Sequence, residues 1–358
     1  MKRILIFIII GTLITSLLSS CSKVEDDSKK EYIFDDSKGL KDVSKYPIGM
    51  AVKPSLMKDN SLYNSVLKKD VNRITPENSM KMKFLSKGKD NYYWDEADFL
   101  VEYAVENGLQ VHGHTLIWDN SVPDWMKNYE TDADGWKLIM KDYIYTVVGR
   151  WRGKINSWDV VNEAIDDNGN IKQGFWYSKI GSDYIDLAFQ YAHEADPDAL
   201  LFYNDYGHEY STTRLKAINK MLSEMKERGV PVHGTGLQMH TSLKRAKYDL
   251  RNAVIESAKT GLLVHVSELD ICVNINNDKN LEYSNSLISA QMDKFYEVAK
   301  AMKDISSEQS YGITTWGVGD GDSFMSGYDY PEWPLLYDSE YKHKAVYESF
   351  WKGCNKNF

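Results

Sequence analysis

The 358-residue sequence contains little cysteine: only Cys21, Cys272 and Cys354. Cys272 and Cys354 lie far apart and in no spacing typical of a metal or redox site, so we expect two unreactive thiols. The chain also lacks an excess of positive charge, because 43 Lys and Arg face 52 Asp and Glu, a formal net charge of -9. A surface that binds nucleic acid needs clustered Lys and Arg, so the composition argues against that class of protein.

Motifs for metals and cofactors are missing as well. Residues 166–170 faintly resemble a calcium loop, but no glycine and distal glutamate stand in register, and we interpret the segment as a turn. Residues 317–321 have the glycines of a phosphate loop without its lysine or its helix start. The sequence also contains no motif of a Ser-His-Asp hydrolase and no zinc-binding motif. We therefore expect neither a metal nor a cofactor.

The one long apolar run is at the N-terminus. Lys2 and Arg3 precede an apolar run over residues 4–18, and small residues come just before Cys21, a pattern that predicts an export signal over residues 1–20 rather than a membrane span. Residues 18–21 (Leu-Ser-Ser-Cys) resemble a bacterial lipobox, which implies lipidation of Cys21. We expect an exported protein that is anchored to a bacterial membrane, and we favour the outer membrane. The acidic residues 25–27 resemble a signal for display on the cell surface.

Residues 21–42 are polar and charged, and we interpret them as a tether. No linker, internal repeat or low-complexity segment divides the rest, and 42% hydrophobic residues suffice for one large core. We therefore predict a single domain over residues 43–358.

Within this domain, short apolar runs alternate with helical patterns such as residues 213–228, where apolar residues recur at helical spacing. Eight strands followed by eight crossovers predict an α/β fold of the (β/α)8 TIM barrel type, and the domain length suits it. The eight predicted strands are residues 47–52, 71–75, 109–115, 156–161, 199–203, 234–238, 263–267 and 311–315.

Polar residues concentrate where these strands end. In a (β/α)8 barrel the C-terminal strand ends form the functional face, so polar side chains gathered there are expected to bind a ligand. Glu163 and Glu268 each end an apolar run. Two carboxyl groups on one face indicate cleavage of a glycosidic bond, because one protonates the leaving oxygen while the other stabilises or attacks the anomeric carbon. The remaining polar strand ends are residues 75–78, 112–114, 204–205, 238–240 and 316.

These residues resemble glycoside hydrolase family 10, the endo-β-1,4-xylanases, over essentially the whole chain after the tether. The resemblance implies a retaining endo-xylanase in which Glu163 is the general acid and then base, and Glu268 is the nucleophile. It also implies xylan and xylo-oligosaccharides as substrates. We expect a monomer. The segments that carry the resemblance are residues 75–81, 113–118, 158–164, 203–206, 236–240, 268–271 and 312–317.

The resemblance also assigns expected roles around the two glutamates. Asn162 would donate to the sugar 2-hydroxyl, and His240 would orient Glu268, with Asp270 holding His240. The other residues expected to bind substrate are Glu77, Asn78 and Lys81 on the non-reducing side, His114, Trp118 and Gln238 around the cleaved ring, Trp316 as its wall, Phe324 where the family has a second tryptophan, and Tyr206 beyond the cleavage point.

Several positions depart from the family pattern: Asp119 with the following Asn120 and Ser121, Gly207, Gly319 and Phe324. Asp119 would add a carboxylate near Glu163. Together the departures predict a more open rim that tolerates decorated xylan.

Two other functions remain open. One is a glycan-binding lipoprotein without catalysis, although both glutamates are present; the other is a hydrolase of a different β-1,4-glycan such as cellulose, from which the Trp316 pocket would distinguish a xylanase. For His112 a ligand role and a core role stay equally open, whereas Asp159 and Trp158 are expected to support their strand.

Overall fold

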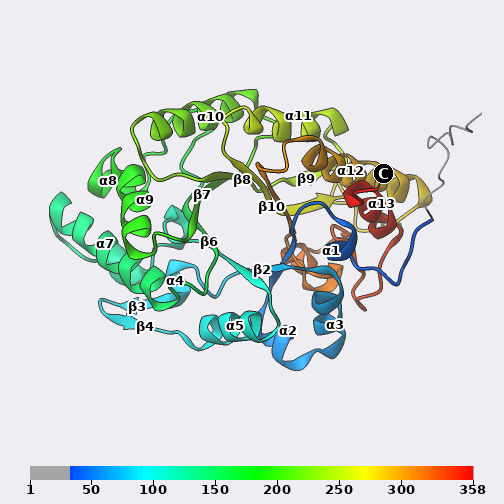
Figure 1. Cartoon of the computed structure of the whole chain (residues 1–358), viewed down its shortest axis with the longest axis horizontal. Helices are drawn as coiled ribbons and strands as arrows, with labels where there is room; N and C mark the ends of the chain where they lie inside the picture. The colour runs from blue at the N-terminus through cyan, green and yellow to red at the C-terminus, as the bar shows by residue number, and fades with distance from the viewer. Residues whose placement is uncertain (1–32, 358) are drawn as a thin grey trace, which may run out of the picture. The chain divides into compact units, whose positions relative to one another are not determined.

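The computed structural model describes residues 33–357, and it contains a closed barrel of eight parallel strands surrounded by helices (Figure 1). Around the barrel the order is β11, β1, β2, β5, β6, β7, β8, β10, and β10 pairs with β11 to close the ring. The predicted (β/α)8 barrel is therefore confirmed. Its strands are β1 (Ile48–Val52), β2 (Arg73–Pro76), β5 (Gln110–Gly113), β6 (Ser157–Asn162), β7 (Leu200–Asp205), β8 (Gly234–Leu237), β10 (Leu263–Cys272) and β11 (Ser310–Thr315).

Each predicted strand is present, and most observed ends lie within a few residues of the predicted ends. The exception is β10, which is longer than predicted. This strand continues to Cys272 because its second half pairs with the short β9 (His240–Ser242), which follows β8 directly. In that register His240 lies opposite Asp270. A two-stranded hairpin of β3 (Ser86–Gly88) and β4 (Asn91–Tyr92) stands apart from the barrel sheet.

The helices pack their apolar sides on the barrel. The pattern over residues 213–228 corresponds to α10 (Thr212–Glu227), in which Leu215, Ile218, Leu222 and Met225 are buried as the 3.6-residue period predicts. The other helices are α1 (Leu40–Val43), α2 (Pro54–Asp59), α3 (Ser61–Asp70), α4 (Met82–Leu85), α5 (Asp95–Glu106), α6 (Asp124–Lys127), α7 (Ala133–Arg150), α8 (Phe175–Ile180), α9 (Tyr184–Ala195), α11 (Lys247–Ala258), α12 (Asn285–Asp304) and α13 (Ala345–Cys354), with short 3₁₀ turns η2 (Asp119–Ser121), η3 (Asp320–Asp322) and η4 (Phe324–Gly327).

Trp158 shows how tightly the strands pack. Its indole is fully buried and occupies the space beside Gly113 on the neighbouring strand, where a β-carbon would lie 2.2 Å from the ring. Trp158 thus supports its strand, as predicted. Cys272 and Cys354 are both free, and burial raises the pKa of the Cys354 thiol to about 12.

The compact unit begins before residue 43, the predicted start of the domain. It begins at Phe34, and Leu40 in α1 is fully buried, with its backbone N–H donating to Asp70 Oδ1 at 3.0 Å. The polar composition of residues 34–42 concealed these few anchoring contacts. The predicted signal segment, Cys21 and most of the tether lie outside the described residues.

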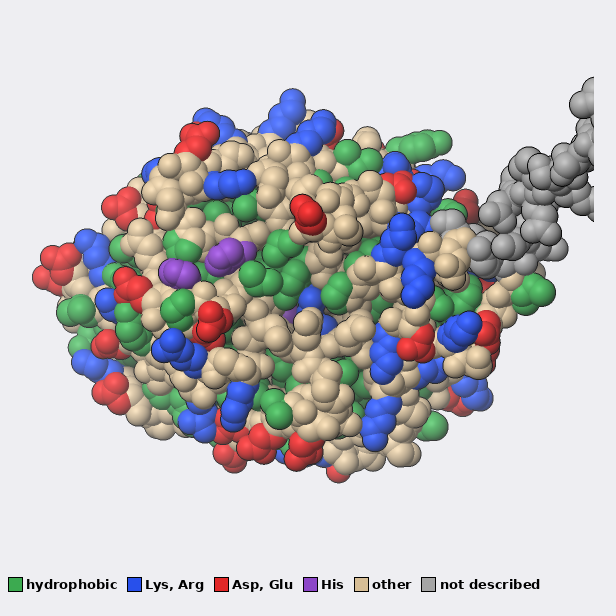
Figure 2. Space-filling model, viewed as in Figure 1, with side chains coloured by type: hydrophobic (Ala, Val, Ile, Leu, Met, Phe, Trp, Pro, Cys, Tyr) green, Lys and Arg blue, Asp and Glu red, His purple; other side chains and the backbone are tan. Residues whose placement is uncertain are grey.

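No helix within residues 33–357 is long and apolar enough to cross a bilayer. On the face shown in Figure 2, basic and acidic side chains are interspersed over the surface.

Candidate active site

One predicted carboxylate, Glu163, stands at the C-terminal end of β6, and the other, Glu268, stands in the middle of β10. Glu163 directly follows β6 with a positive φ of 58°, and its backbone N–H donates to the carbonyl of Asn204 at 2.9 Å. A non-glycine residue in the left-handed region costs free energy, and such residues are concentrated at functional sites. Glu268 lies within β10, only 4% exposed, and its N–H donates to the carbonyl of Gln238 at 3.0 Å.

Three amide side chains connect the carboxylates. Asn204 Nδ2 donates to Glu268 Oε1 at 2.7 Å and to Asn162 Oδ1 at 2.9 Å. Gln238 Nε2 lies 3.0 Å from Glu163 Oε1 and 3.3 Å from Asn162 Oδ1. A continuous set of hydrogen bonds therefore runs from one carboxylate to the other across β6, β7 and β8, and it restricts the rotamers of both groups.

His240 and Asp270 complete the surroundings of Glu268. His240 Nε2 lies 3.0 Å from Glu268 Oε2, and its Nδ1 lies 2.6 Å from Asp270 Oδ2, the contact expected from the sequence. Burial disfavours a charged imidazole, but Asp270 and Glu268 together raise the pKa of His240 well above its ordinary value. The ring is thus an imidazolium that donates to both carboxylates.

The charge on Glu268 follows from these contacts. Burial would raise the pKa of a carboxyl group, yet the hydrogen bond from His240 and the charges of His114, His240 and Lys81 lower the pKa of Glu268 below its ordinary value. Glu268 is therefore ionised at neutral pH, the state that a nucleophile requires.

Asp159 organises the histidines below this site. Its Oδ2 lies 2.8 Å from His114 Nδ1, and its Oδ1 lies 2.9 Å from His112 Nε2. Burial opposes ionisation of Asp159, but the two histidines lower its pKa far below the ordinary value. His112 also contacts Ser157 Oγ at 2.6 Å and is fully buried, so it belongs to the core.

The residues expected on the non-reducing side form one connected wall. Glu77 accepts a hydrogen bond from Asn78 at 2.9 Å and lies 3.4 Å from Lys53 Nζ. Lys81 Nζ donates to Asn78 Oδ1 at 3.1 Å and lies over two aromatic rings, 5.1 Å from the centroid of Trp118 and 5.8 Å from that of Trp316.

Trp316 links this wall to the catalytic pair. Its ring packs edge-on against His114, with 5.1 Å between the centroids, and against His240 at 6.0 Å, leaving 6% of the residue exposed. Phe324, on η4, also packs edge-on against His240, with 5.4 Å between the centroids, and is 43% exposed. The predicted residues on these strands are thus brought together by direct contacts.

Tyr206 is held from beneath by Arg214, a residue that the sequence did not single out. The Arg214 guanidinium lies 3.9 Å from the centroid of the Tyr206 ring, pairs with Asp205 at 2.6 Å and donates to the carbonyl of Ile165 at 2.7 Å. Its side chain is fully buried. Arg214 therefore fixes the loop after Glu163 to the loop that presents Tyr206.

Two departures from the family pattern have structural explanations. The carboxylate of Asp119 accepts from the backbone N–H of Trp176 at 3.1 Å and fills the space beside Gly174, so it caps the start of α8. At Gly319 a β-carbon would lie 2.6 Å from the carbonyl oxygen of Asp338. Gly319 therefore leaves no gap beside Asp338, and the openness of the rim stays a prediction.

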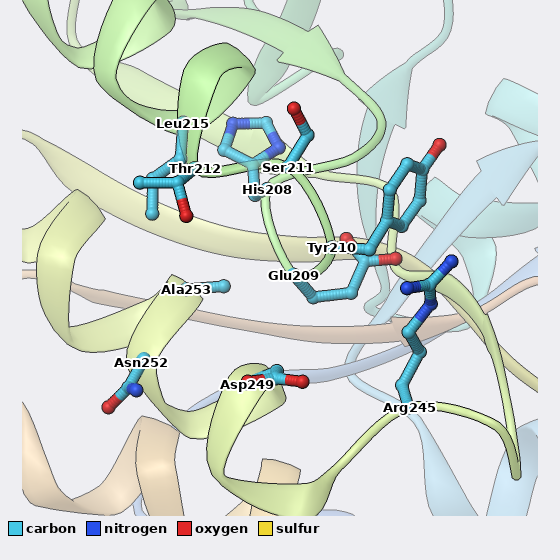
Figure 3. A pocket seen from close by; sticks show the side chains of 10 residues that line it. All are labelled: His208, Glu209, Tyr210, Ser211, Thr212, Leu215, Arg245, Asp249, Asn252 and Ala253. Carbon is cyan, nitrogen blue, oxygen red and sulfur yellow. The ribbon is translucent and has the colours of Figure 1, made fainter.

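The sequence assigned no role to two residues that stand out in the structure. Asn204 contacts the predicted nucleophile, and Glu209 is a buried carboxylate. Asn204 belonged to a polar strand end, but nothing indicated that its amide reaches Glu268. Glu209 is 3% exposed, and neither of its carboxylate oxygens has a hydrogen-bond partner among the described residues. Figure 3 shows Glu209 at a pocket of about 180 Å³ between the loop after β7 and α11.

The segment that faintly resembles a calcium loop, residues 166–170, forms a turn. Asp166 Oδ1 accepts from the N–H groups of Asn168 and Asn170 at 2.9 and 2.8 Å, the turn predicted for this segment. Within residues 33–357 no group of three or more His, Cys, Asp or Glu side chains is arranged to hold a metal ion.

Comparison with known proteins provides independent information. The model of glycosyl hydrolase family 10 matches residues 39–352. A beta-1,4-xylanase from Dictyoglomus thermophilum is 37% identical over 304 residues, which cover 81% of this chain and 83% of the relative.

Two longer relatives are each 34% identical over 318 residues: endo-1,4-beta-xylanase A from Thermoanaerobacterium saccharolyticum and Exoglucanase XynX from Acetivibrio thermocellus. These matches cover 84% of this chain but only 26% and 28% of those relatives, so the chain spans about a quarter of their length.

Among solved structures, a mutant of the intracellular xylanase TsXylA from Thermoanaerobacterium saccharolyticum, in complex with xylotetraose, superposes with a TM-score of 0.80 at 33% identity. It covers 89% of this chain and 100% of the TsXylA chain.

Proposed function

The chain belongs to glycosyl hydrolase family 10, and on that premise we propose that it is an endo-β-1,4-xylanase that hydrolyses internal bonds of xylan with retention of anomeric configuration. The observation that carries the proposal is the paired arrangement of Glu163 and Glu268, joined through Asn162, Asn204 and Gln238, with an imidazolium keeping Glu268 ionised.

In the first step, Glu163 donates its proton to the glycosidic oxygen while a carboxylate oxygen of Glu268 forms a bond to the anomeric carbon. The bond from that carbon to the leaving sugar breaks, and a glycosyl ester of Glu268 remains. Gln238 positions Glu163, and His240 with Asn204 holds Glu268 in the orientation for attack.

In the second step, Glu163, now a carboxylate, accepts a proton from water as the water oxygen attacks the anomeric carbon. The ester bond breaks and Glu268 is regenerated as a carboxylate. During ester formation Glu268 loses its charge, so the attraction that favours the imidazolium of His240 weakens, and Asp270 remains as its counter-ion.

Preference for xylose is supported by the crowding at Trp316. The indole packs on His114 and His240 and lies beside Lys81, so these neighbours hold it in place. Glucose carries a hydroxymethyl group that xylose lacks, and a wall that cannot relax disfavours the larger sugar.

The test is product analysis on linear xylan and on a soluble cellulose derivative with the full chain, its Glu268→Ala variant and a Glu227→Ala control at an exposed position. We expect short xylo-oligosaccharides from the wild type and the control, and a rate at least about 10⁴-fold lower for Glu268→Ala because the nucleophile is missing. If the Glu268→Ala variant releases the same amount of product as the wild type, Glu268 is not the nucleophile.

A second candidate is hydrolysis of a β-1,4-glucan, which the name of the relative Exoglucanase XynX favours. Cleavage of the cellulose derivative in preference to xylan would support it. No cleavage of either polymer, together with binding of xylan, would instead support a non-catalytic glycan-binding lipoprotein.

We also propose that Cys21 carries a lipid that anchors a monomeric enzyme to a bacterial membrane, with the outer membrane as the expected site. The basic start, the apolar run and the lipobox-like Leu-Ser-Ser-Cys of residues 18–21 support this proposal. Labelling with a radioactive fatty acid in a bacterial host should mark the wild type and leave a Cys21→Ser variant unmarked. Equal labelling of both would contradict lipidation at Cys21.

A further inference from the structure

A second polar hollow lies beside the wall that binds the non-reducing side in the proposed function. It has a volume of about 490 Å³ and is bounded by α4, the start of β3 and residues 120–127. Lys83 lies two residues after Lys81, and Asn120 lies two residues after Trp118, so both boundaries continue directly from proposed substrate-binding residues. The hollow therefore lies next to the residues proposed to bind the non-reducing side of the substrate.

The boundaries of this hollow are tied to each other. The backbone N–H of Lys83 donates to Ser121 Oγ at 3.3 Å, and Trp125 Nε1 donates to Ser86 Oγ at 3.0 Å. Each bond joins the α4–β3 side to the 120–127 side. The hollow is thus formed before any ligand enters, which lowers the entropic cost of binding.

The side chains at this hollow suit an acidic sugar. Phe84 is 37% exposed, and the ammonium groups of Lys83 and Lys87 lie 5.2 and 6.0 Å from its ring centroid. Across residues 33–357, no carboxylate forms an ion pair with either lysine, and Asp124, the carboxylate that lines the hollow, is paired with Lys127 at 2.9 Å. Lys83 and Lys87 therefore place two positive charges without an ion-pair partner beside an exposed aromatic side chain.

We propose that this hollow binds a uronic acid substituent on the substrate chain, with the carboxylate at Lys83 and Lys87 and the apolar face of a sugar ring on Phe84. The inference rests on the proposed function, because it places the acidic sugar on a β-1,4-xylan chain that continues from the cleft. Aromatic rings stack on sugar faces, and ammonium groups attract carboxylates in a salt-dependent way. Acidic substituents would then direct the enzyme to particular positions along xylan.

The test is affinity electrophoresis of the full chain in gels that contain glucuronoxylan or the same polymer after reduction of its carboxyl groups. All proteins carry Glu268→Ala so that the polymer stays intact. We expect tighter binding to the acidic polymer than to the reduced one. Lys83→Gln/Lys87→Gln should abolish this difference by weakening binding to the acidic polymer about three- to tenfold, as for the loss of two exposed charge contacts.

Two further variants separate the contributions. Lys216→Gln/Lys220→Gln removes the same charge from exposed positions of α10 and should retain the wild-type preference. Phe84→Ala should weaken binding to both polymers. Two results would overturn the proposal. One is equal binding of the acidic and reduced polymers by the protein that carries Glu268→Ala alone. The other is an unchanged preference for the acidic polymer in Lys83→Gln/Lys87→Gln.

Hydrolysis of linear xylo-oligosaccharides keeps this test distinct from that of the proposed function. The lysine double variant in a chain with Glu268 intact should cleave these neutral substrates at the wild-type rate. Absence of cleavage by the wild type would refute the xylanase assignment while leaving the electrophoretic comparison of the two polymers interpretable.

Discussion

Glu268 and Glu209 are buried to nearly the same extent, with 4% and 3% of each residue exposed, yet their pKa values shift in opposite directions. Both oxygens of Glu268 accept hydrogen bonds, and its pKa is lowered. Neither oxygen of Glu209 has a partner among the described residues, and burial raises the pKa of Glu209 to about 7. Burial alone therefore favours a neutral carboxyl group, and the hydrogen-bonding partners are what keep Glu268 charged.

The largest effect expected from this comparison is that of His240→Gln. Loss of the imidazolium removes a hydrogen bond and a positive charge from Glu268, so its pKa should rise and the acid limb of kcat/KM should move to higher pH. We expect kcat to fall about 10³-fold, as when a donor aimed at the reacting group is lost. A pH–rate profile of the variant on xylan measures both effects, and an unchanged acid limb would contradict the role of His240.

Glu209→Gln tests the other half of the comparison through stability. A folded-state pKa of about 7 lies above the ordinary 4.5, so the folded protein binds the proton more tightly than the unfolded chain and loses stability as the pH rises from 4.5 to 7. Glutamine cannot ionise. The variant should exceed the wild type by up to about 3 kcal/mol in unfolding free energy at pH 8 and match it near pH 4.

Urea unfolding at the two pH values measures this difference. Glu227→Gln, at an exposed position of α10, serves as the control and should change stability little at either pH. An equal gain for Glu209→Gln at both pH values would show that ionisation of Glu209 is not the cause.

Asn204→Ala should have a somewhat smaller effect, on activity. Its amide donates to both Glu268 and Asn162, so the substitution leaves the nucleophile with one fixed oxygen and frees the residue expected to bind the sugar 2-hydroxyl. We expect kcat to fall about 100-fold, with a smaller change in KM. Steady-state kinetics on xylohexaose provide the measurement, with Asn219→Ala on α10 as a control for loss of an asparagine elsewhere. A rise in KM alone would contradict a role in the transition state.

The smallest effect is expected for Ser267→Ala. Ser267 Oγ donates to Asn204 Oδ1 at 2.6 Å, which fixes the amide so that its nitrogen faces Glu268. Loss of this single neutral hydrogen bond should lower kcat by about three- to tenfold. If Ser267→Ala lowers kcat as much as Asn204→Ala does, Ser267 acts by more than its hydrogen bond to Asn204, which would contradict this role.

Much of this site could be predicted from local sequence. Glu163 and Glu268 end apolar runs, and the barrel rule places such ends on one face. The contact between His240 and Asp270 was expected too, because Asp270 shares a strand face with Glu268. These inferences need only the period of a strand and the order of the strands.

What could not be predicted depends on distances between separate strands and loops. Asn204 reaches Glu268 across one strand, β8, and a β-carbon at Gly236 on that strand would lie 2.2 Å from the Asn204 Oδ1, so this amide requires a glycine there. Glu209 lacks partners only because of how its loop packs. Asp119 binds the start of α8, a contact between residues 57 positions apart that nothing in the local sequence indicates.

The closure of the barrel also brings two remote stretches of the chain together. Ser44 forms a bridge with Asn355, the N–H of Lys356 donates to the carbonyl of Val43 at 3.0 Å, and Trp351 Nε1 donates to the carbonyl of Lys38 at 3.1 Å. A short linker could therefore join these stretches, and new ends could be opened at the exposed turn of Lys89 and Asp90 between β3 and β4. In such a circular permutant all eight strands would keep their neighbours, and both glutamates would keep their partners.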